Sequence, residues 1–528
     1  MIRVVVWDEA GLLASGIVTR LRIALPLVVV ATACSVSQSG TVQLELMLPP
    51  SGGLRPTGMT TVAITTQAEA TGATSVTTTQ LEGSGSSMHF SAGEVAVGVP
   101  ITLSAELHDA SGRLVGYGEV SDSITPSASE LVTVTIPVRK PIVFVSSTMP
   151  VTTIDPTLYS NDPMYEGTIS QSAVIVVPVD GNDVAAVSSA GVQLLATATN
   201  APDGHAIAIS GTPLDAIAVP GQRQLVVGTM TGVVIVDLDA GTTTQVATAE
   251  ADRVAVGGSE SNGYTAYVLS GRVAPPEGAM AAPCGGSSMV FAIALGGSKP
   301  TAMQVSSSVP LADLAADETG PIGADPCDGN VSRIGSGGKL MLALPGAAAV
   351  AVQHDTVWAA GSMPPDTSGT DPVGARIVLA SIGTNGSSSQ STELPPKSET
   401  MQYLDDTSAS FARTMRADTE VPLDLAVLPT GDQLALIARM DSHSDALYDQ
   451  FNDKAVPEMD ATVHDIVLVD PTTTALTRIR ANCTLTVTAS SGAEFPDWGC
   501  QNAADGGALT PPGGQYTPSA VDAVYGSR

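Results

Sequence analysis

Apolar and polar residues alternate along several short stretches between residues 41 and 138, and most of these stretches are rich in Val, Thr or Leu. In TVQLELML every second side chain is apolar, which is the pattern of a β-strand with one buried and one exposed face. Gly, Pro and Ser separate the stretches, as they do at turns. The pattern predicts strands at 41–48, 59–66, 74–81, 101–109, 113–120 and 131–138.

Six or seven such strands in about 100 residues are typical of an immunoglobulin-like β-sandwich, which we expect over residues 41–140. Ala110-Ser111-Gly112 falls between two of the strands and predicts a hairpin, because Gly adopts the positive φ that tight turns need. The Cys and Trp residues of an antibody core are missing from this region, so the similarity concerns architecture alone.

An internal repeat organises the rest of the chain. PLDAIAVPGQRQLVV begins at Pro213, and PLDLAVLPTGDQLAL begins at Pro422. Each copy is followed by a second pair of apolar stretches, VVIVDLDAGTTTQVA in the first and DIVLVDPTTTALTRI in the second. A repeat built from β-type segments predicts a repeat architecture in which neighbouring units share their cores.

The segment PIVFVSSTMPVTTIDPTLYSN, which begins at Pro141, resembles one repeat of the YVTN family of β-propellers. The element that carries the resemblance is Ile154-Asp155-Pro156, and Val236-Asp237 and Val469-Asp470-Pro471 occupy the same place in the two strong repeats. The resemblance implies a β-propeller over residues 141–528. We interpret these Asp residues, with Asp215 and Asp424 of the repeat openings, as strand-edge and turn residues rather than catalytic acids.

The number of repeated hairpins sets the expected number of blades. Hairpins near residues 155, 190, 237, 296, 384 and 470 give six units, and KLMLALPG (339–346) indicates a seventh. The C-terminal PSAVDAVYGSR (518–528) resembles the opening strand of a unit, whereas the segment from Pro141 lacks one. We therefore expect a six- or seven-bladed propeller whose last strand completes the first blade and removes the open sheet edges.

Five segments depart from the repeat and are predicted to be loops or inserts. Long loops on a rigid scaffold are where binding specificity is usually placed. The segments are 271–287, 309–331, 395–420, 441–460 and 481–517.

The N-terminus predicts export. Arg20 and Arg22 precede the apolar run 23–30, which is shorter than the roughly 20 residues that span a bilayer. Ala31-Thr32-Ala33-Cys34 follows and resembles the lipobox of bacterial lipoproteins. We expect residues 1–33 to be a signal peptide, Cys34 to carry the lipid anchor, and residues 34–40 to form a tether to the membrane. An ordinary signal peptide with an incidental Cys is the alternative.

Four further cysteines remain, an even number that fits disulfides in an oxidising compartment. Three pairings are possible, and sequence proximity favours Cys284–Cys327 and Cys483–Cys500. No two cysteines have the CxxC spacing of zinc ribbons or thioredoxins.

Charge and motif content exclude several function classes. The formal net charge is −30, and without a basic run such a surface repels nucleic acid. No GxSxG, HExxH, GxxxxGK[ST] or helix-opening GxGxxG motif is present. Asp441, His443 and Asp445 are candidate ligands for a divalent cation such as calcium, although the acidic composition of the segment favours a solvated insert without a metal.

Two hypotheses from different classes follow. The first is a lipid-anchored protein of a bacterial cell envelope, on the outer-membrane or periplasmic side, which acts as a non-enzymatic binding or assembly scaffold through its propeller loops. Its expected partners are the membrane and an envelope protein. The second is a secreted or periplasmic propeller hydrolase that uses acidic residues with a divalent cation.

Overall fold

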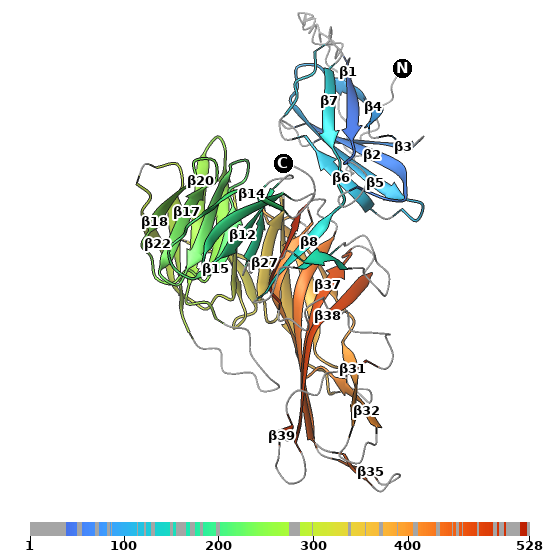
Figure 1. Ribbon diagram of the computed structural model, residues 1–528, viewed down its shortest axis with the longest axis vertical. Helices are drawn as coiled ribbons and strands as arrows, with labels where there is room; N and C mark the ends of the chain where they lie inside the picture. Colours follow the sequence, from blue (N-terminus) through green and yellow to red (C-terminus); the bar gives the residue numbers. More distant parts are fainter. Residues whose placement is uncertain are drawn as a thin grey trace, which may run out of the picture. The chain divides into compact units, whose positions relative to one another are not determined.

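The protein is all-β in the part that the computed structural model describes, which lies between residues 39 and 524 (Figure 1). The predicted signal peptide and Cys34 lie outside these residues. The described part contains no helix long and apolar enough to cross a membrane. Within 39–524, the structure does not describe 50–54, 69–72, 82–84, 86, 113, 121–122, 128–131, 148–151, 155–164, 169–174, 180–182, 197–200, 274–285, 298, 336–338, 354, 369–372, 388, 405–409, 429–432, 446, 450–453, 457, 472–474, 489–493, 496–500 and 503–517.

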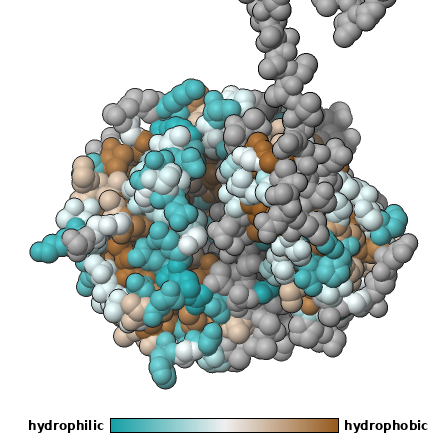
Figure 2. Space-filling model, turned by 90° about the horizontal axis from the view of Figure 1, so that it is seen from above, coloured by the Kyte–Doolittle hydropathy of each residue, from teal (hydrophilic) through white to brown (hydrophobic). Residues whose placement is uncertain are grey.

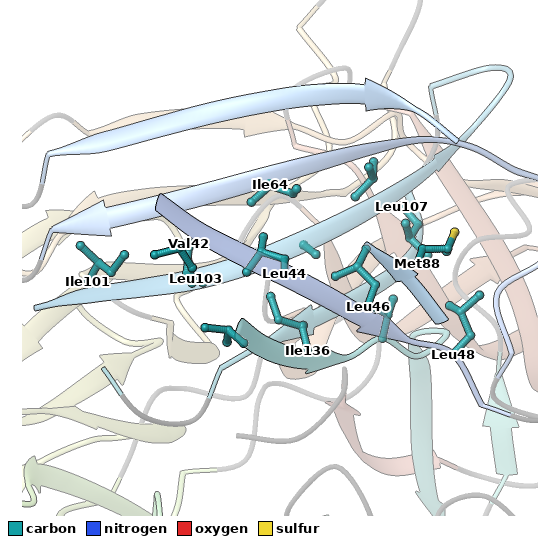
Figure 3. Packing of buried hydrophobic residues seen from close by; sticks show 14 of the residues in the cluster. Val42, Leu44, Leu46, Leu48, Ile64, Met88, Ile101, Leu103, Leu107 and Ile136 are labelled. Atoms are coloured by element: carbon teal, nitrogen blue, oxygen red, sulfur yellow. The ribbon is translucent and has the colours of Figure 1, made fainter. Parts of the chain in front are cut away.

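Residues 39–140 form two sheets with a shared hydrophobic core (Figure 3). The alternation in β1 places Val42, Leu44 and Leu46 in this core, and each is fully buried. Gly112 adopts φ of 79° between β5 and β6, which confirms the predicted hairpin. The strands are β1 (Ser39–Met47), β2 (Met59–Ala68), β3 (Thr74–Gln80), β4 (Ser87–Ala96), β5 (Ile101–Asp109), β6 (Leu114–Glu119) and β7 (Val132–Pro137).

The strand order of this sandwich is not that of a constant-type immunoglobulin domain. The sheets are β4-β1-β7 and β3-β2-β5-β6, and β1 pairs in parallel with β7. A constant-type immunoglobulin domain instead places its first, second, fifth and fourth strands in one sheet. The strand alternation predicts which residues are buried, but it carries no information on which strands pair. The predicted strands are present, together with β4, whose weaker alternation the sequence pattern did not reveal.

In the described part of residues 142–524, seven sheets of four or more antiparallel strands form the blades of a β-propeller (Figure 1). The first three blades are β41 (Pro518–Val524) with β8 (Ile142–Ser147), β9 (Thr152–Ile154) and β10 (Tyr165–Thr168); β11 (Ile175–Pro178), β12 (Asp183–Ser188), β13 (Gly191–Ala196) and β14 (Ala201–Ile207); and β15 (Pro213–Ala218), β16 (Gln224–Thr229), β17 (Gly232–Asp237) and β18 (Thr242–Val246).

The remaining four blades follow in chain order. They are β19 (Arg253–Ser259), β20 (Gly263–Ser270), β21 (Ser288–Ala294) and β22 (Ala302–Val309); β23 (Asp313–Asp317), β24 (Gly320–Asp325), β25 (Asn330–Arg333) and β26 (Leu340–Ala343); β27 (Ala349–Gln353), β28 (Thr356–Met363), β29 (Arg376–Gly383) and β30 (Gln390–Glu393); and β33 (Thr419–Val427), β34 (Leu434–Ser444), β37 (Glu458–Val469), β38 (Leu476–Thr488) and β39 (Glu494–Phe495).

The C-terminal strand closes the ring, as the sequence predicts. β41 pairs antiparallel with β8, from Pro518 opposite Ser147 to Val524 opposite Ile142. The innermost strands β41, β11, β15, β19, β23, β27 and β33 contact one another in that order, and β33 in turn contacts β41. Each blade therefore covers the faces of its two neighbours. Strands such as β17 (GVVIVD) are buried at nearly every position for this reason.

The predicted turn role of Asp237 is confirmed. Its Oδ1 accepts a hydrogen bond of 2.8 Å from the backbone N–H of Ala240, three residues along the chain. Asp325 does the same for the N–H groups of Cys327 and Asp328. Asp325-Pro326 therefore has the same sequence as the Asp470-Pro471 element of the seventh blade, and the prediction of an insert at 309–331 was wrong. That segment contains β23, β24 and part of β25, which belong to the fifth blade.

The predicted inserts 395–420 and 441–460 form an extension of the seventh blade. β34, β37 and β38 are 11, 12 and 13 residues long, and in Figure 1 the orange and red strands β37 and β38 continue from the blade to β39. A separate buried cluster that includes Met415, Met440 and Met459 packs this region. Within the predicted insert 441–460, residues 447–449 form the short strand β35. The other strands here are β31 (Ser398–Leu404), β32 (Ser410–Arg416), β36 (Lys454–Val456) and β40 (Gln501–Asn502).

Candidate functional site

The innermost strands bring three aspartates from three blades together. Asp215 lies on β15 and Asp424 on β33, at the repeat positions that the sequence singled out, and Asp313 begins β23. Asp215 Oδ2 accepts a hydrogen bond of 2.8 Å from the N–H of Val254 on β19. Asp313 Oδ2 accepts one of 2.9 Å from the N–H of Val350 on β27. Each of these two carboxylates thus joins its own blade to the next, which is a structural role.

Arg253 lies between the three aspartates. Its Nη2 is 3.3 Å from Asp424 Oδ1, its Nε is 3.3 Å from Asp313 Oδ1, and its Nη1 is 3.7 Å from Asp215 Oδ1. Only 7% of the Arg253 side chain is exposed, and its carboxylate partners are 5% to 14% exposed. One guanidinium therefore connects the third, fourth, fifth and seventh blades. We call Arg253, Asp215, Asp313 and Asp424 the central cluster.

A second arginine, Arg272, supplies a further positive charge beside the central cluster. Arg272 donates from Nε to the carbonyl of Ala312 at 2.6 Å and from Nη2 to the carbonyl of Leu423 at 3.1 Å. Burial lowers the pKa of Arg272, and the nearby charge of Arg253 lowers it further. The three carboxylates and two guanidinium groups leave a net charge of −1 when all are ionised, so the carboxylates are nearly neutralised.

Burial dominates the protonation of the carboxylates in the central cluster. It raises the pKa of Asp215 to about 6, although the charge of Arg253 and the hydrogen bond from Val254 act in the opposite direction. Burial likewise raises the pKa of Asp313, against the attraction of Arg253. A raised pKa is a property of many catalytic acids, but buried ion pairs that serve structure share it.

A pocket of about 680 Å³ is lined by residues of the innermost strands, and the central cluster is among them. Glu260, Glu318 and Asp355 also line it, and each lies just beyond the end of an innermost strand, whereas Arg253 and Asp313 begin theirs. One end of the pocket therefore carries carboxylates, and the ion-paired central cluster lies toward the other end. Figure 2 shows hydrophilic and hydrophobic residues interspersed on the face that it displays.

The predicted cation ligands are only partly brought together. His443 Nδ1 lies 2.7 Å from Asp460 Oδ1 across the β34–β37 pair, and its Nε2 lies 3.2 Å from Asp445 Oδ1. These two carboxylates raise the pKa of His443. Glu458 is close enough that one ligand atom each from His443, Glu458 and Asp460 lie within 4.8 Å of one another. Sequence reasoning missed Glu458 and Asp460, because only strand pairing places them opposite His443.

Asp441 does not belong to this group. Its side chain is nearly buried, and its carboxylate is held by Arg439 Nε at 3.1 Å and by Thr462 Oγ1 at 2.8 Å. The predicted set of Asp441, His443 and Asp445 is therefore replaced by His443, Glu458 and Asp460, with Asp445 beside them. The imidazole of His443 and the carboxylates of Glu458 and Asp460 are groups that can bind a divalent cation.

Two of the four predicted disulfide cysteines lie in the described residues. Cys327 follows β24 in the fifth blade, Cys483 lies buried in β38, and each takes part in a disulfide bond. Cys284 and Cys500, the partners that sequence proximity favours, lie outside the described residues. The pairing stays a prediction.

Comparison with known proteins finds no matching family model and no matching curated protein. Solved structures that resemble the chain include U3-55K (11% identity over 56% of this chain and 84% of that chain, TM-score 0.36) and the RRP9 WD40 repeats (11% identity over 56% and 83%, TM-score 0.35). A structure of a nidogen/laminin complex matches with 9% identity over 48% of this chain and 94% of that chain, at a TM-score of 0.31. The propeller assignment rests on the strand order and ring closure described above.

Proposed function

We propose that the protein is a non-enzymatic binding or assembly scaffold of a bacterial cell envelope, held at the membrane through a lipid on Cys34. The observation that carries the scaffold proposal is the central cluster. The hydrolase hypothesis requires acidic residues that are free to react, and the acids of the central cluster are held by Arg253 and backbone N–H groups. A general base must be free to accept a proton from its substrate.

The extension of the seventh blade is where we expect a partner to bind. A ring of similar blades offers similar surfaces, whereas among the described residues the extension around β31, β32, β37 and β38 occurs on the seventh blade alone. Rigid scaffolds commonly carry their specificity on such additions. The partner is proposed to be another envelope protein, and the strongly acidic net charge of −30 argues against nucleic acid.

Site-specific cross-linking in intact envelopes tests this proposal. A photoreactive residue at the exposed Asp460 on the extension should give discrete cross-linked species. The same residue at Asp239, which is exposed on the third blade, serves as the matched control. Cross-links of equal yield from both positions, or from neither, would contradict binding through the extension.

The lipid anchor has its own test. Mass spectrometry of the mature N-terminus should find a diacylglyceryl group on Cys34, and a Cys34→Ser variant should be released from the membrane fraction. An unmodified terminus at another residue would refute the anchor and leave the scaffold proposal untouched.

A divalent-cation hydrolase is the second candidate, and the group of His443, Glu458 and Asp460 is the observation that favours it. Two carboxylates and an imidazole would leave coordination positions open for water, as catalytic metal sites do. A hydrolase of this kind should lose activity on replacement of His443, whereas a scaffold should keep its cross-linked partner.

A further inference from the structure

A second buried charged cluster lies where the chain passes from the sixth blade to the seventh. Lys397 follows β30, Glu420 lies on β33, and Asp465 lies on β37. Their side chains are 8%, 0% and 3% exposed. Arg478 on β38 is 15% exposed and completes the group. Charged side chains are almost never this buried unless they are paired.

The register of the seventh blade places three of these residues on one face of its sheet. Pro422 pairs with Ala438, and Ala438 pairs with Asp465, so their side chains point to the same side. Glu420 is two residues before Pro422 and shares that side, because strand side chains alternate. Arg478 pairs with Val467, two residues after Asp465, and shares it too. Lys397 reaches this face from the preceding blade.

The contacts within the cluster are direct. The Lys397 ammonium contacts the Asp465 carboxylate at Oδ2. Arg478 Nη1 is 2.6 Å from Glu420 Oε1 and 3.7 Å from Asp465 Oδ2, so it links the two acids. In the described part of the chain, the other carboxylate oxygens, Asp465 Oδ1 and Glu420 Oε2, are buried and have no hydrogen-bond partner. An unsatisfied buried oxygen costs free energy that a neutral group would not.

We propose that Lys397 and Asp465 form an intramolecular amide, an isopeptide bond between Lys397 Nζ and Asp465 Cγ. The pair has what such a condensation requires: an amine and a carboxyl in contact, held apart from solvent, beside a second carboxyl that can carry a proton. Proximity of this kind makes an otherwise slow bimolecular reaction effectively unimolecular.

The reaction needs no other reactant. The ammonium of Lys397 gives up a proton, and its nitrogen lone pair attacks Asp465 Cγ to form a tetrahedral intermediate. One Asp465 oxygen then leaves with two protons as water, and the C–N bond remains. An ammonium and a carboxylate thus become an amide and one water molecule, with no change in oxidation state.

Glu420 is the group that carries the proton from nitrogen to oxygen. Burial raises the pKa of Glu420, against the attraction of Arg478, so the carboxyl takes up a proton more readily than an exposed Glu. After the reaction the charges still balance, because Glu420 and Arg478 remain as one buried pair. The charge pair of Lys397 and Asp465 is replaced by a neutral amide, which removes the cost of burying it.

The bond would join the sixth and seventh blades across 68 residues of sequence, next to the hydrophobic cluster of Leu394, Ala438 and Val467 that packs these blades together. Unlike a disulfide it is not cleaved by thiols. It would therefore hold the base of the extension to the ring under reducing conditions and under pulling force.

Intact-mass spectrometry of the full mature chain, after reduction of its disulfides, tests the proposal. The wild-type mass should be one water molecule below the sequence mass, which here means the calculated mass of the mature chain together with any lipid on Cys34. Proteolysis should give a branched peptide that contains Lys397 and Asp465. Lys397→Arg, which keeps the positive charge, should restore the full mass, whereas Lys339→Arg on β26's N-terminal side should keep the deficit.

Glu420→Gln separates chemistry from structure. The Gln side chain is close in size to Glu but cannot carry the proton. The variant should therefore show the full sequence mass, with Lys397 in a linear peptide. A wild-type chain at full sequence mass with Lys397 in linear peptides would overturn the proposal and leave an ordinary buried ion pair. This measurement decides the question even if the variants do not fold.

Discussion

Replacement of Arg253 by Met removes the guanidinium from the central cluster and keeps much of its apolar stem. Asp215, Asp313 and Asp424 then remain buried without their common cation. Breaking a buried ion pair by removing one partner costs about 3–5 kcal/mol. We expect a loss of this order in the free energy of unfolding of the propeller at pH 7, measured by urea denaturation followed by circular dichroism.

Arg223→Met is the matched control for this change. Arg223 also contacts two aspartates, Asp183 and Asp239, but its side chain is 34% exposed and Asp239 is 71% exposed. Asp183 is 10% exposed, so only the Arg223–Asp239 pair is of the exposed kind that contributes about 0–1 kcal/mol, and Arg223→Met should cost less than Arg253→Met because the Arg223 guanidinium stays partly hydrated. If Arg253→Met costs no more than Arg223→Met, the view that Arg253 holds the blades together through their acids is wrong.

The pH dependence gives an independent check. The pKa of Asp215 is raised to about 6 from an ordinary value of 3.8, so the folded state binds its proton more tightly than the unfolded state. The contribution of this group is therefore favourable below pH 3.8 and is lost as the pH rises through about 6, by roughly 3 kcal/mol for a shift of this size. Asp215→Asn should flatten this part of the stability profile, and it should also recover part of the stability that Arg253→Met loses. Strict additivity of the two changes would show that the two side chains do not interact.

Three further predictions concern the turns, the ring closure and the cation ligands. Asp237→Ala should lower the free energy of unfolding by about 0.5–1.5 kcal/mol in urea denaturation, because the turn loses the hydrogen bond from the N–H of Ala240 to the Asp237 side chain. Asp239→Ala should lower it less. Equal effects of the two changes would show that Asp237 does not stabilise the turn. Deletion of 518–528 should leave β8 as an open edge and produce oligomers in size-exclusion chromatography, and a monomeric, equally stable product would argue against ring closure by β41. If His443, Glu458 and Asp460 hold a cation, calorimetric titration of the wild type with Ca²⁺ or Zn²⁺ should show binding, and His443→Ala should abolish it. A wild-type titration without heat would refute the cation site.

Much of the fold follows from local sequence because its signals are local. Alternation along a strand, Gly112 in a hairpin and Asp237 in a turn each act within a few residues of themselves. The C-terminal strand that completes the first blade was also predictable, because its sequence matches a blade opening that the first blade lacks. The fifth blade was partly missed, although Asp325-Pro326 carries the same turn signal, because its strands are short and interrupted by Gly and Asp.

The sites depend on pairing between distant strands, which local patterns do not encode. The repeat marks Asp215 and Asp424, but nothing in either copy indicates that Arg253 lies between them. The sequence shows His443 among acids, yet Asp460 meets it only through the register of β34 and β37.

By itself, the sequence determined an all-β chain with a repeated blade unit, a closing strand and turn-forming aspartates, because these are set by side-chain periodicity and short-range hydrogen bonds. The tertiary structure alone decided the sandwich strand order, the number of blades, the pairing of three aspartates with Arg253, and the contact between Lys397 and Asp465. These features arise when ring closure and strand register bring together residues that lie far apart in the chain. The charged groups buried there are tolerated because each lies beside a group of opposite charge.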